Sequence, residues 1–180
     1  NLSISATTRN PRVGEIEGKS YFFKTKEEFE AMVDRGEFLE HAMIYDNYYG
    51  TPKKAIFDEL DMGRDVILEI EMQGAMQIKE VYPQAVFIFV LPPSLQELRN
   101  RIVGRGTETE EQIEKRFNSA YDEIKLLGDY DYFIFNNIVE QSAEEILNIL
   151  EVEKNKVSRY KKDILDMFEK EIKNVKTIIK

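Results

Sequence analysis

The sequence predicts an α/β fold in which a parallel sheet lies between helices. Three apolar runs, at 65–70, 85–91 and 132–136, are nearly continuous rather than alternating, as is typical of strands that are buried on both faces. Signals for helix starts lie between these runs, so strands and helices alternate along the chain. Shorter and more polar runs at 20–24 and 36–50 predict a small antiparallel lobe beside this core.

The helices are predicted from their capping patterns. Three hydroxyl residues are followed three positions later by Glu, which makes a capping box, and a fourth precedes a proline that suits the first helical position. We therefore expect helix N-caps at four positions: Thr25, Thr51, Ser94 and Ser142. From Val157 onward the Lys-rich chain predicts an amphipathic helix that packs on the protein.

Length, charge and composition narrow the class of protein. A chain of 180 residues with a formal charge of -9 is expected to form one domain, and its acidic balance argues against nucleic acid and membrane as partners. The absence of cysteine excludes disulfides and thiolate metal sites, and the lone His41 excludes a histidine cluster. No signal-peptide pattern opens the chain, so we expect a cytoplasmic protein.

The first candidate site is the loop around Arg9 and Arg12. Pro11 stiffens this loop, and the hydroxyls of Ser5, Thr7 and Thr8 lie nearby in sequence. Two guanidinium groups on a stiff loop match the oxygens of a phosphate. The alternative is a solvated loop whose arginines pair with surface carboxylates.

The second candidate site combines Glu40 and Thr51 with Tyr45, Tyr48 and Tyr49. These side chains offer polar tips on apolar rings, which suits a planar ligand with a polar edge. A glutamate accepts from two adjacent N–H groups, and among purines guanine presents such a pair, whereas adenine presents an acceptor. The pattern therefore favours guanine, and the alternative is a tyrosine-rich hairpin core with a glutamate at its rim.

The third candidate site follows the apolar run 65–70. Glu69 and Glu71 come where the strand ends, at the edge of a parallel sheet where α/β proteins bind ligands, and Gly74 allows a close backbone approach. The two carboxylates could hold Mg²⁺ through water or accept hydrogen bonds from a ligand.

The fourth candidate is a mobile segment. Gly104 and Gly106 flank Arg105, and Thr109 can cap a helix that carries Arg116. A hinge followed by exposed arginines predicts a lid that closes over a phosphoryl group. The alternative is a surface helix with ion pairs.

Six stretches, taken in order, together resemble the guanylate kinase family: SATTRNPRVGEIEGKSYFF, FLEHAMIYDNYYGT, ILEIEMQGA, LPPS, GRGTETEEQIEKR and YDYFIFNN. The resemblance implies transfer of the γ-phosphoryl group of MgATP to GMP, giving ADP and GDP. It also implies a P-loop kinase fold, with a three-layer α/β/α core, a small mixed β lobe and a helical lid. The parts would be a GMP-binding lobe at 4–60, core at 61–103, the lid at 104–127, and core with C-terminal helices at 128–180. A monomer and a homo-oligomer are both compatible with the sequence.

The resemblance also implies roles for individual residues. The GMP phosphate clamp would consist of Ser5, Arg9, Arg12 and Tyr21, supported by Tyr49. Glu40 and Thr51 would read guanine with Glu69 beside them, and Glu71 would lie near Mg²⁺. Arg105 and Arg116 would contact the ATP phosphates, and Asn136 would approach the adenine. The catalytic set implied by the family is thus Arg12, Arg105, Arg116 and Glu71.

One motif of the family does not occur in the sequence. We find no G-x-x-x-x-G-K-[ST] pattern, so we expect the first strand and the P-loop to precede Asn1, and we expect these 180 residues alone to be inactive. The alternative function is an inactive, guanylate kinase-like binding module for phosphorylated peptides. Glu40, Thr51 and the lid arginines argue against that module, and Glu40 argues against a kinase for another nucleoside monophosphate.

Overall fold

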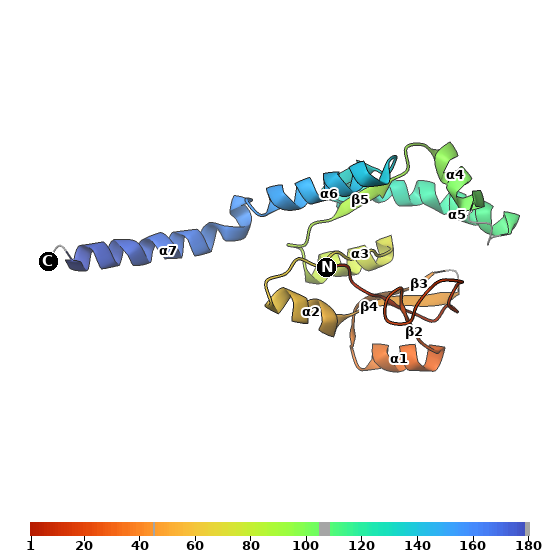
Figure 1. Ribbon diagram of the computed structural model, residues 1–180, viewed down its shortest axis with the longest axis horizontal. Coiled ribbons are helices and arrows are strands. Elements are labelled where there is room, and N and C mark those ends of the chain that lie inside the picture. The colour runs from red at the N-terminus through yellow and green to blue at the C-terminus, as the bar shows by residue number, and fades with distance from the viewer. Residues whose placement is uncertain (45, 105–108, 179–180) are drawn as a thin grey trace. The chain divides into compact units, whose positions relative to one another are not determined.

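The computed structural model describes residues 1–44, 46–104 and 109–178 and divides into two compact units, which we describe separately (Figure 1). The first unit, Asn1–Ala85, contains β1 (Ala6–Thr7), β2 (Phe22–Phe23), α1 (Lys26–Asp34), β3 (Phe38–Ile44), β4 (Asn47–Pro52), α2 (Lys53–Asp61) and α3 (Met72–Val81). The second unit, Val86–Lys180, contains β5 (Ile88–Leu91), α4 (Leu95–Gly104), α5 (Glu110–Ile124), the 3-10 helix η1 (Lys125–Asp129), β6 (Tyr132–Phe135), α6 (Val139–Glu153) and α7 (Val157–Ile178).

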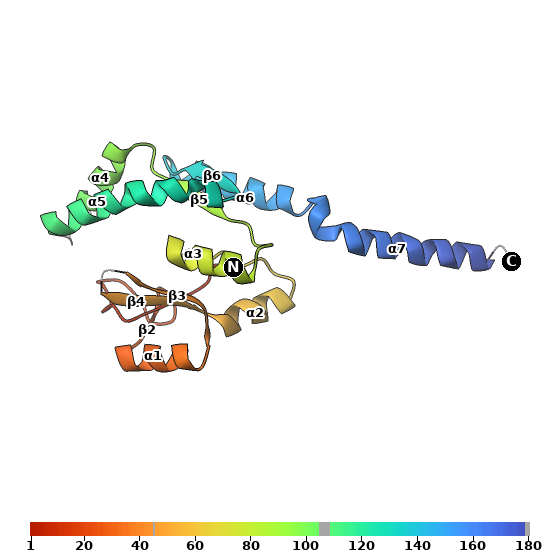
Figure 2. The same ribbon diagram turned by 180° about the vertical axis from the view of Figure 1, so that it is seen from behind.

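The first unit is built on a mixed sheet of four strands in the order β2-β1-β4-β3. β1 pairs in parallel with β2 and antiparallel with β4, and β3 and β4 form an antiparallel hairpin. Helices α1 and α3 lie on opposite sides of this sheet (Figures 1 and 2). The small β lobe is therefore present with β3 as one of its edges, but it is mixed, as the resemblance implied, rather than purely antiparallel.

Aromatic stacking holds α1 on the sheet. The ring of Phe29 is fully buried and stacks on Phe38 and Tyr48, with ring centroids 4.4 and 5.3 Å away. A Cβ at Gly50 would lie 2.9 Å from the Phe38 ring, so this position of β4 has room only for glycine. Tyr48 is thus part of the core, as the alternative of a tyrosine-rich hairpin core proposed.

The capping predictions are correct at two positions and wrong at two. Thr25 forms the predicted capping box with Glu28, and Ser94 accepts from the backbone N–H of Glu97 at 3.1 Å. Thr51 remains within β4 and donates to Glu40, so Pro52 becomes the N-cap of α2. Ser142 lies inside α6, where its hydroxyl donates to the carbonyl of Ile138 at 3.0 Å.

In the second unit β5 and β6 pair in parallel from Ile88↔Tyr132 to Leu91↔Phe135, which confirms two of the three predicted parallel strands. The third prediction is wrong: within the described residues, 65–70 forms only the single parallel bridge Leu2↔Ile67. A strand needs a neighbour over several residues, and the chain at 1–3 pairs with this run at one register position. The three-layer core with its P-loop kinase arrangement stays a prediction.

The C-terminal helix forms as predicted, but apolar side chains along its described part are exposed. Leu165 and Phe168 on α7 are 53% and 52% exposed, so the expected packing is not found among the described residues. At the turn before α7, the carboxylate of Glu153 accepts from the Tyr132 hydroxyl at 2.7 Å, from Lys156 at 3.0 Å and from Arg159 at 2.7 Å. These bonds connect β6, the end of α6 and the start of α7. None of the helices in the described ranges is long and apolar enough to cross a membrane.

Candidate active site

The side chains of Glu40 and Thr51 form a buried pair in the first unit. The two residues face each other across β3 and β4, and both are buried, at 5% and 0% exposed. The Thr51 hydroxyl donates to Glu40 Oε1 at 2.7 Å. Burial raises the pKa of Glu40; the hydrogen bonds from Thr51 oppose this effect, and the nearby carboxylate of Glu71 adds to it. No cation pairs with Glu40 in the part of the chain that the structure describes.

The two carboxylates that follow the run 65–70 lie near different partners. Glu71 is the exposed N-cap residue of α3 and acts electrostatically on Glu40, whereas Glu69 is exposed and acts on Tyr21. Within the described ranges, no group of three or more histidine or acidic side chains could hold a metal ion. Mg²⁺ commonly takes one or two carboxylates and completes its shell with water and substrate phosphates, so an exposed Glu71 fits such a role.

Arg9 is held by a carboxylate that follows it in the same loop. Its guanidinium makes two bonds to Glu15, at 2.7 and 3.0 Å, and a third to the Asn10 carbonyl at 2.6 Å. The side chains of Arg9 and Glu15 are only 15% and 19% exposed. The hydrogen bond to Glu15 raises the pKa of Arg9 and lowers that of Glu15. Arg9 is thus paired, as the surface-loop alternative proposed, but in a partly buried position.

Aromatic side chains flank the same guanidinium. The Arg9 Cζ atom lies 5.4 Å from the centroid of the Tyr21 ring, and Tyr49 packs edge-on against Tyr21 at 6.1 Å. A hydrogen bond to Tyr49 also raises the pKa of Arg9. Burial, followed by the charges of Tyr49 and Glu69, raises the pKa of the Tyr21 hydroxyl, which therefore stays protonated at neutral pH and can donate.

Arg12 differs from Arg9, because its guanidinium makes no hydrogen bond or ion pair with any described residue. Its side chain is exposed, whereas its backbone N–H donates to the Glu15 carboxylate at 2.6 Å and its carbonyl accepts from the Glu15 N–H at 3.1 Å. The expected donors Thr7 and Thr8 are instead bonded to the backbone of Tyr48, at 3.0 and 2.9 Å. Their hydroxyls hold β1 against β4.

Ser5 lies just before β1 and is half-buried, with its carbonyl accepting from the Phe22 N–H at 2.9 Å. The structure thus brings Arg9, Tyr21, Tyr49 and Glu69 together as one group, and Glu40, Thr51 and Glu71 as another. The remaining two acceptor-side positions, Ser5 and Arg12, lie on either side of Arg9 in the chain.

The predicted donor-side residues belong to the second unit. Arg116 lies on α5 and is half-buried, and Asn136 directly follows β6, where its N–H donates to the Leu91 carbonyl at 2.7 Å. Arg105 lies outside the described residues, as does Tyr45.

The sequence analysis did not single out two residues of the first unit, Glu15 and Gln77. Glu15 organises the arginine loop, and Gln77 on α3 contacts β3 at His41. Gly74, which was expected to allow a close approach of the backbone, lies on the same helix against the side chain of Glu40. An acidic side chain in a basic loop was the available signal for Glu15. Gly74 and Gln77 are three apart on one helix face, but their partners lie more than thirty residues away in sequence.

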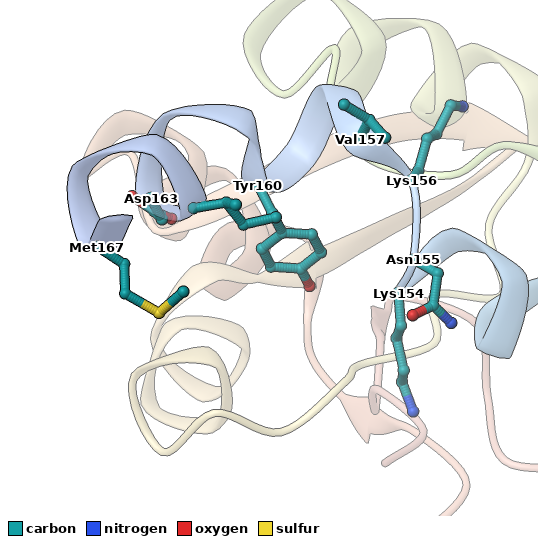
Figure 3. A pocket seen from close by; sticks show the side chains of 8 residues that line it. Lys154, Asn155, Lys156, Val157, Tyr160, Asp163 and Met167 are labelled. Carbon is teal, nitrogen blue, oxygen red and sulfur yellow. The ribbon is translucent and has the colours of Figure 1, made fainter. Parts of the chain in front are cut away.

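An open hollow lies at the turn between α6 and α7 (Figure 3). Side chains such as Tyr160, Ile164 and Met167 line it with residues of the turn itself. None of the predicted site residues contributes to it, so we do not count it as part of the site.

The known proteins that this chain resembles are guanylate kinases. The family model described as guanylate kinase matches residues 1–153. The guanylate kinase of Clostridioides difficile is 67% identical over 171 residues, covering 95% of this chain and 83% of that protein. The guanylate kinase of Clostridium tetani is 54% identical over 164 residues, covering 91% and 79%. The crystal structure of guanylate kinase from Anaplasma phagocytophilum matches with a TM-score of 0.76 at 39% identity, covering 87% of this chain and 77% of that one.

Proposed function

The chain belongs to the guanylate kinase family, and from this premise we propose that it transfers the γ-phosphoryl group of ATP to GMP, giving ADP and GDP. The observation that carries the choice of acceptor is the buried pair of Glu40 and Thr51, whose carboxylate has no cationic partner among the described residues. Such a carboxylate suits the adjacent N1–H and 2-amino donors of guanine.

We propose that the phosphate of GMP is bound by the group around Arg9. Glu15, Asn10 and Tyr49 occupy only part of the five N–H donors of the Arg9 guanidinium, so donor capacity remains for a phosphate. Arg12, which is exposed, adds a second guanidinium, and the protonated Tyr21 hydroxyl adds a neutral donor. Ser5 and Tyr49 complete the proposed clamp, with Glu69 near Tyr21.

The mechanism needs positioning and charge neutralisation more than covalent chemistry. In phosphoryl transfer the acceptor oxygen already belongs to the substrate, so a protein has to hold the two nucleotides in line and compensate their charge. Arg12 would hold the acceptor phosphate, and Arg116 with Arg105 would approach the donor phosphates. Asn136 would lie near the adenine.

We propose that Glu71 holds Mg²⁺ through water, since it is exposed and follows the run 65–70. The ion would neutralise charge on the phosphate oxygens of ATP. The donor's phosphate cradle stays a prediction from the resemblance, because the sequence contains no G-x-x-x-x-G-K-[ST] pattern. The division into a GMP-binding lobe at 4–60, a lid at 104–127 and two core segments also remains part of the proposal, as does a cytoplasmic location.

The test is ADP formation from MgATP by the intact native protein, with GMP and then AMP as acceptor. We expect turnover with GMP and little with AMP, because AMP presents an acceptor where Glu40 needs a donor. Equal turnover with AMP would contradict the role of Glu40, and no turnover with either acceptor would contradict phosphoryl transfer itself.

A further inference from the structure

Helix α3 docks on the edge strand β3 through one side-chain amide. Gln77 Nε2 donates to the His41 carbonyl at 2.8 Å, and Gln77 Oε1 accepts from the His41 N–H at 3.2 Å. Because β3 is an edge of its sheet, these two backbone groups lack a neighbouring strand on this side. The amide therefore takes the place of a strand residue and fixes the helix at one register position.

One turn earlier on the same face of α3, Gly74 lies against the side chain of Glu40. A Cβ at this position would lie 2.8 Å from Glu40 Cδ and 3.2 Å from Glu40 Cγ. Gly74 is buried and has helical backbone geometry, so the position requires glycine for space rather than for an unusual φ. The first turn of α3 therefore forms one wall of the space that holds the Glu40 carboxylate.

The two contacts act on adjacent residues of β3. The bonds of Gln77 to His41 set the distance between the helix and the strand. At that distance, Gly74 lies in contact with the side chain of Glu40. Thr51 holds Glu40 from the other side through its hydroxyl. With a helix backbone on one side and a hydroxyl on the other, the carboxylate is restricted to one orientation, and preorganised acceptors bind their ligands with a smaller entropic cost.

We infer that Gln77 is a positioning residue for guanine recognition, holding α3 so that Gly74 confines the Glu40 carboxylate beside Thr51. This inference rests on the proposed role of Glu40 as the group that reads the base. Gln77 itself bonds to the protein backbone rather than to the nucleotide.

The first test replaces Gln77 with methionine, which keeps the length of the side chain and removes both hydrogen bonds to His41. Titration calorimetry of the intact protein would measure the affinities for GMP and for IMP, which lacks the 2-amino group. We expect the Kd for GMP to rise about 10-fold and the Kd for IMP to rise much less, because a loosened carboxylate loses the second N–H contact first. Equal changes for both nucleotides would show a general structural role and overturn the inference.

A second variant guards against loss of folding. Gly74→Ala keeps the Gln77 side chain and inserts a methyl group from which the Glu40 carboxylate has to move away, while alanine favours the helix more than glycine does. We expect the same preferential loss of GMP over IMP. The matched control is Gln141→Met on α6, an exposed glutamine outside the first unit, which should change neither affinity.

The double variant separates the inference from the proposed function. If Gln77 acts through Glu40, then Gln77→Met should add little to the effect of Glu40→Gln on GMP binding. A full additional loss would overturn the inference. If Glu40→Gln alone leaves GMP binding unchanged, the proposed role of Glu40 fails; if it weakens binding while Gln77→Met does not, only the inference fails.

Discussion

Two buried carboxylates, one in each unit, have opposite surroundings. Glu40 and Glu153 are 5% and 4% exposed. Burial raises the pKa of Glu40, whose hydrogen-bond donor is the uncharged Thr51. Hydrogen bonds from Tyr132, and then from the cations Lys156 and Arg159, lower the pKa of Glu153 to about 2 despite its burial. Two carboxylates with similar burial thus have pKa values that are shifted in opposite directions.

The difference fits the proposed roles, in which Glu40 binds a ligand and Glu153 holds the fold. A buried charge is costly unless donors of hydrogen bonds or opposite charges surround it. Glu153 accepts hydrogen bonds from one neutral donor and two cations of its own chain, so it stabilises the turn between α6 and α7. Glu40 receives fewer, so its carboxylate keeps acceptor capacity for the proposed guanine ligand, at the cost of some stability.

The largest expected effect is on nucleotide binding by Glu40→Gln. The amide presents a donor where guanine also presents one, so we expect the Kd for GMP to rise about 100-fold. Titration calorimetry measures this change. Thermal unfolding should show little loss of stability, because the variant no longer buries a charge. Unchanged GMP affinity would show that Glu40 does not bind GMP, and its contrast with Glu153 would then have no connection with ligand binding.

The converse variant is Glu153→Gln. It leaves Lys156 and Arg159 without their anion, so we expect the free energy of unfolding to fall by about 2 kcal/mol, a reduced loss because both cations reach solvent. Urea unfolding measures the loss. GMP affinity should stay within about twofold of the original. A variant as stable as the original protein would show that the cluster contributes nothing to the turn.

The arginines extend the comparison. Arg159 is neutralised by Glu153, whereas Arg12 has an exposed guanidinium that makes no ion pair in the described ranges. Arg12→Lys replaces a planar fork with a point charge, so the Kd for GMP should rise about 10-fold. The control is Arg35→Lys, an exposed arginine that pairs with Glu37. Equal GMP affinity in the two variants would assign Arg12 to the surface.

The smallest expected effect is in the pH dependence of stability. The folded-state pKa of Glu153 is depressed, so its contribution is present above its ordinary value of 4.5 and is lost as the pH falls from there towards about 2. The folded-state pKa of Glu40 is raised, so its contribution is fully present below 4.5 and is lost as the pH rises through the folded value.

Unfolding measured from acid to neutral pH should therefore separate the two variants. Glu153→Gln should flatten the loss of stability in acid, and Glu40→Gln should remove a loss above pH 4.5. Parallel curves for both variants would contradict the opposite shifts.

The sequence by itself determined what depends on near neighbours in the chain. The capping box of Thr25 with Glu28 is complete within four residues, and the apolar runs that became β5 and β6 contain their own β propensity. That Glu40 and Thr51 lie near each other was also predictable, because a hairpin brings the two strands together over a short turn. These features need little information from distant parts of the chain.

Only the tertiary structure decided which polar groups found their partners across long separations. Thr51 was expected to cap a helix, but its hydroxyl bonds to Glu40, and Ser142 lies within a helix that begins earlier than its capping box suggests. The bonds from Gln77 to His41, and the packing of Gly74 on Glu40, depend on how α3 meets an edge strand. Hydrogen-bonding groups are satisfied by whichever partner the fold brings near, and spacing in the sequence does not specify that partner.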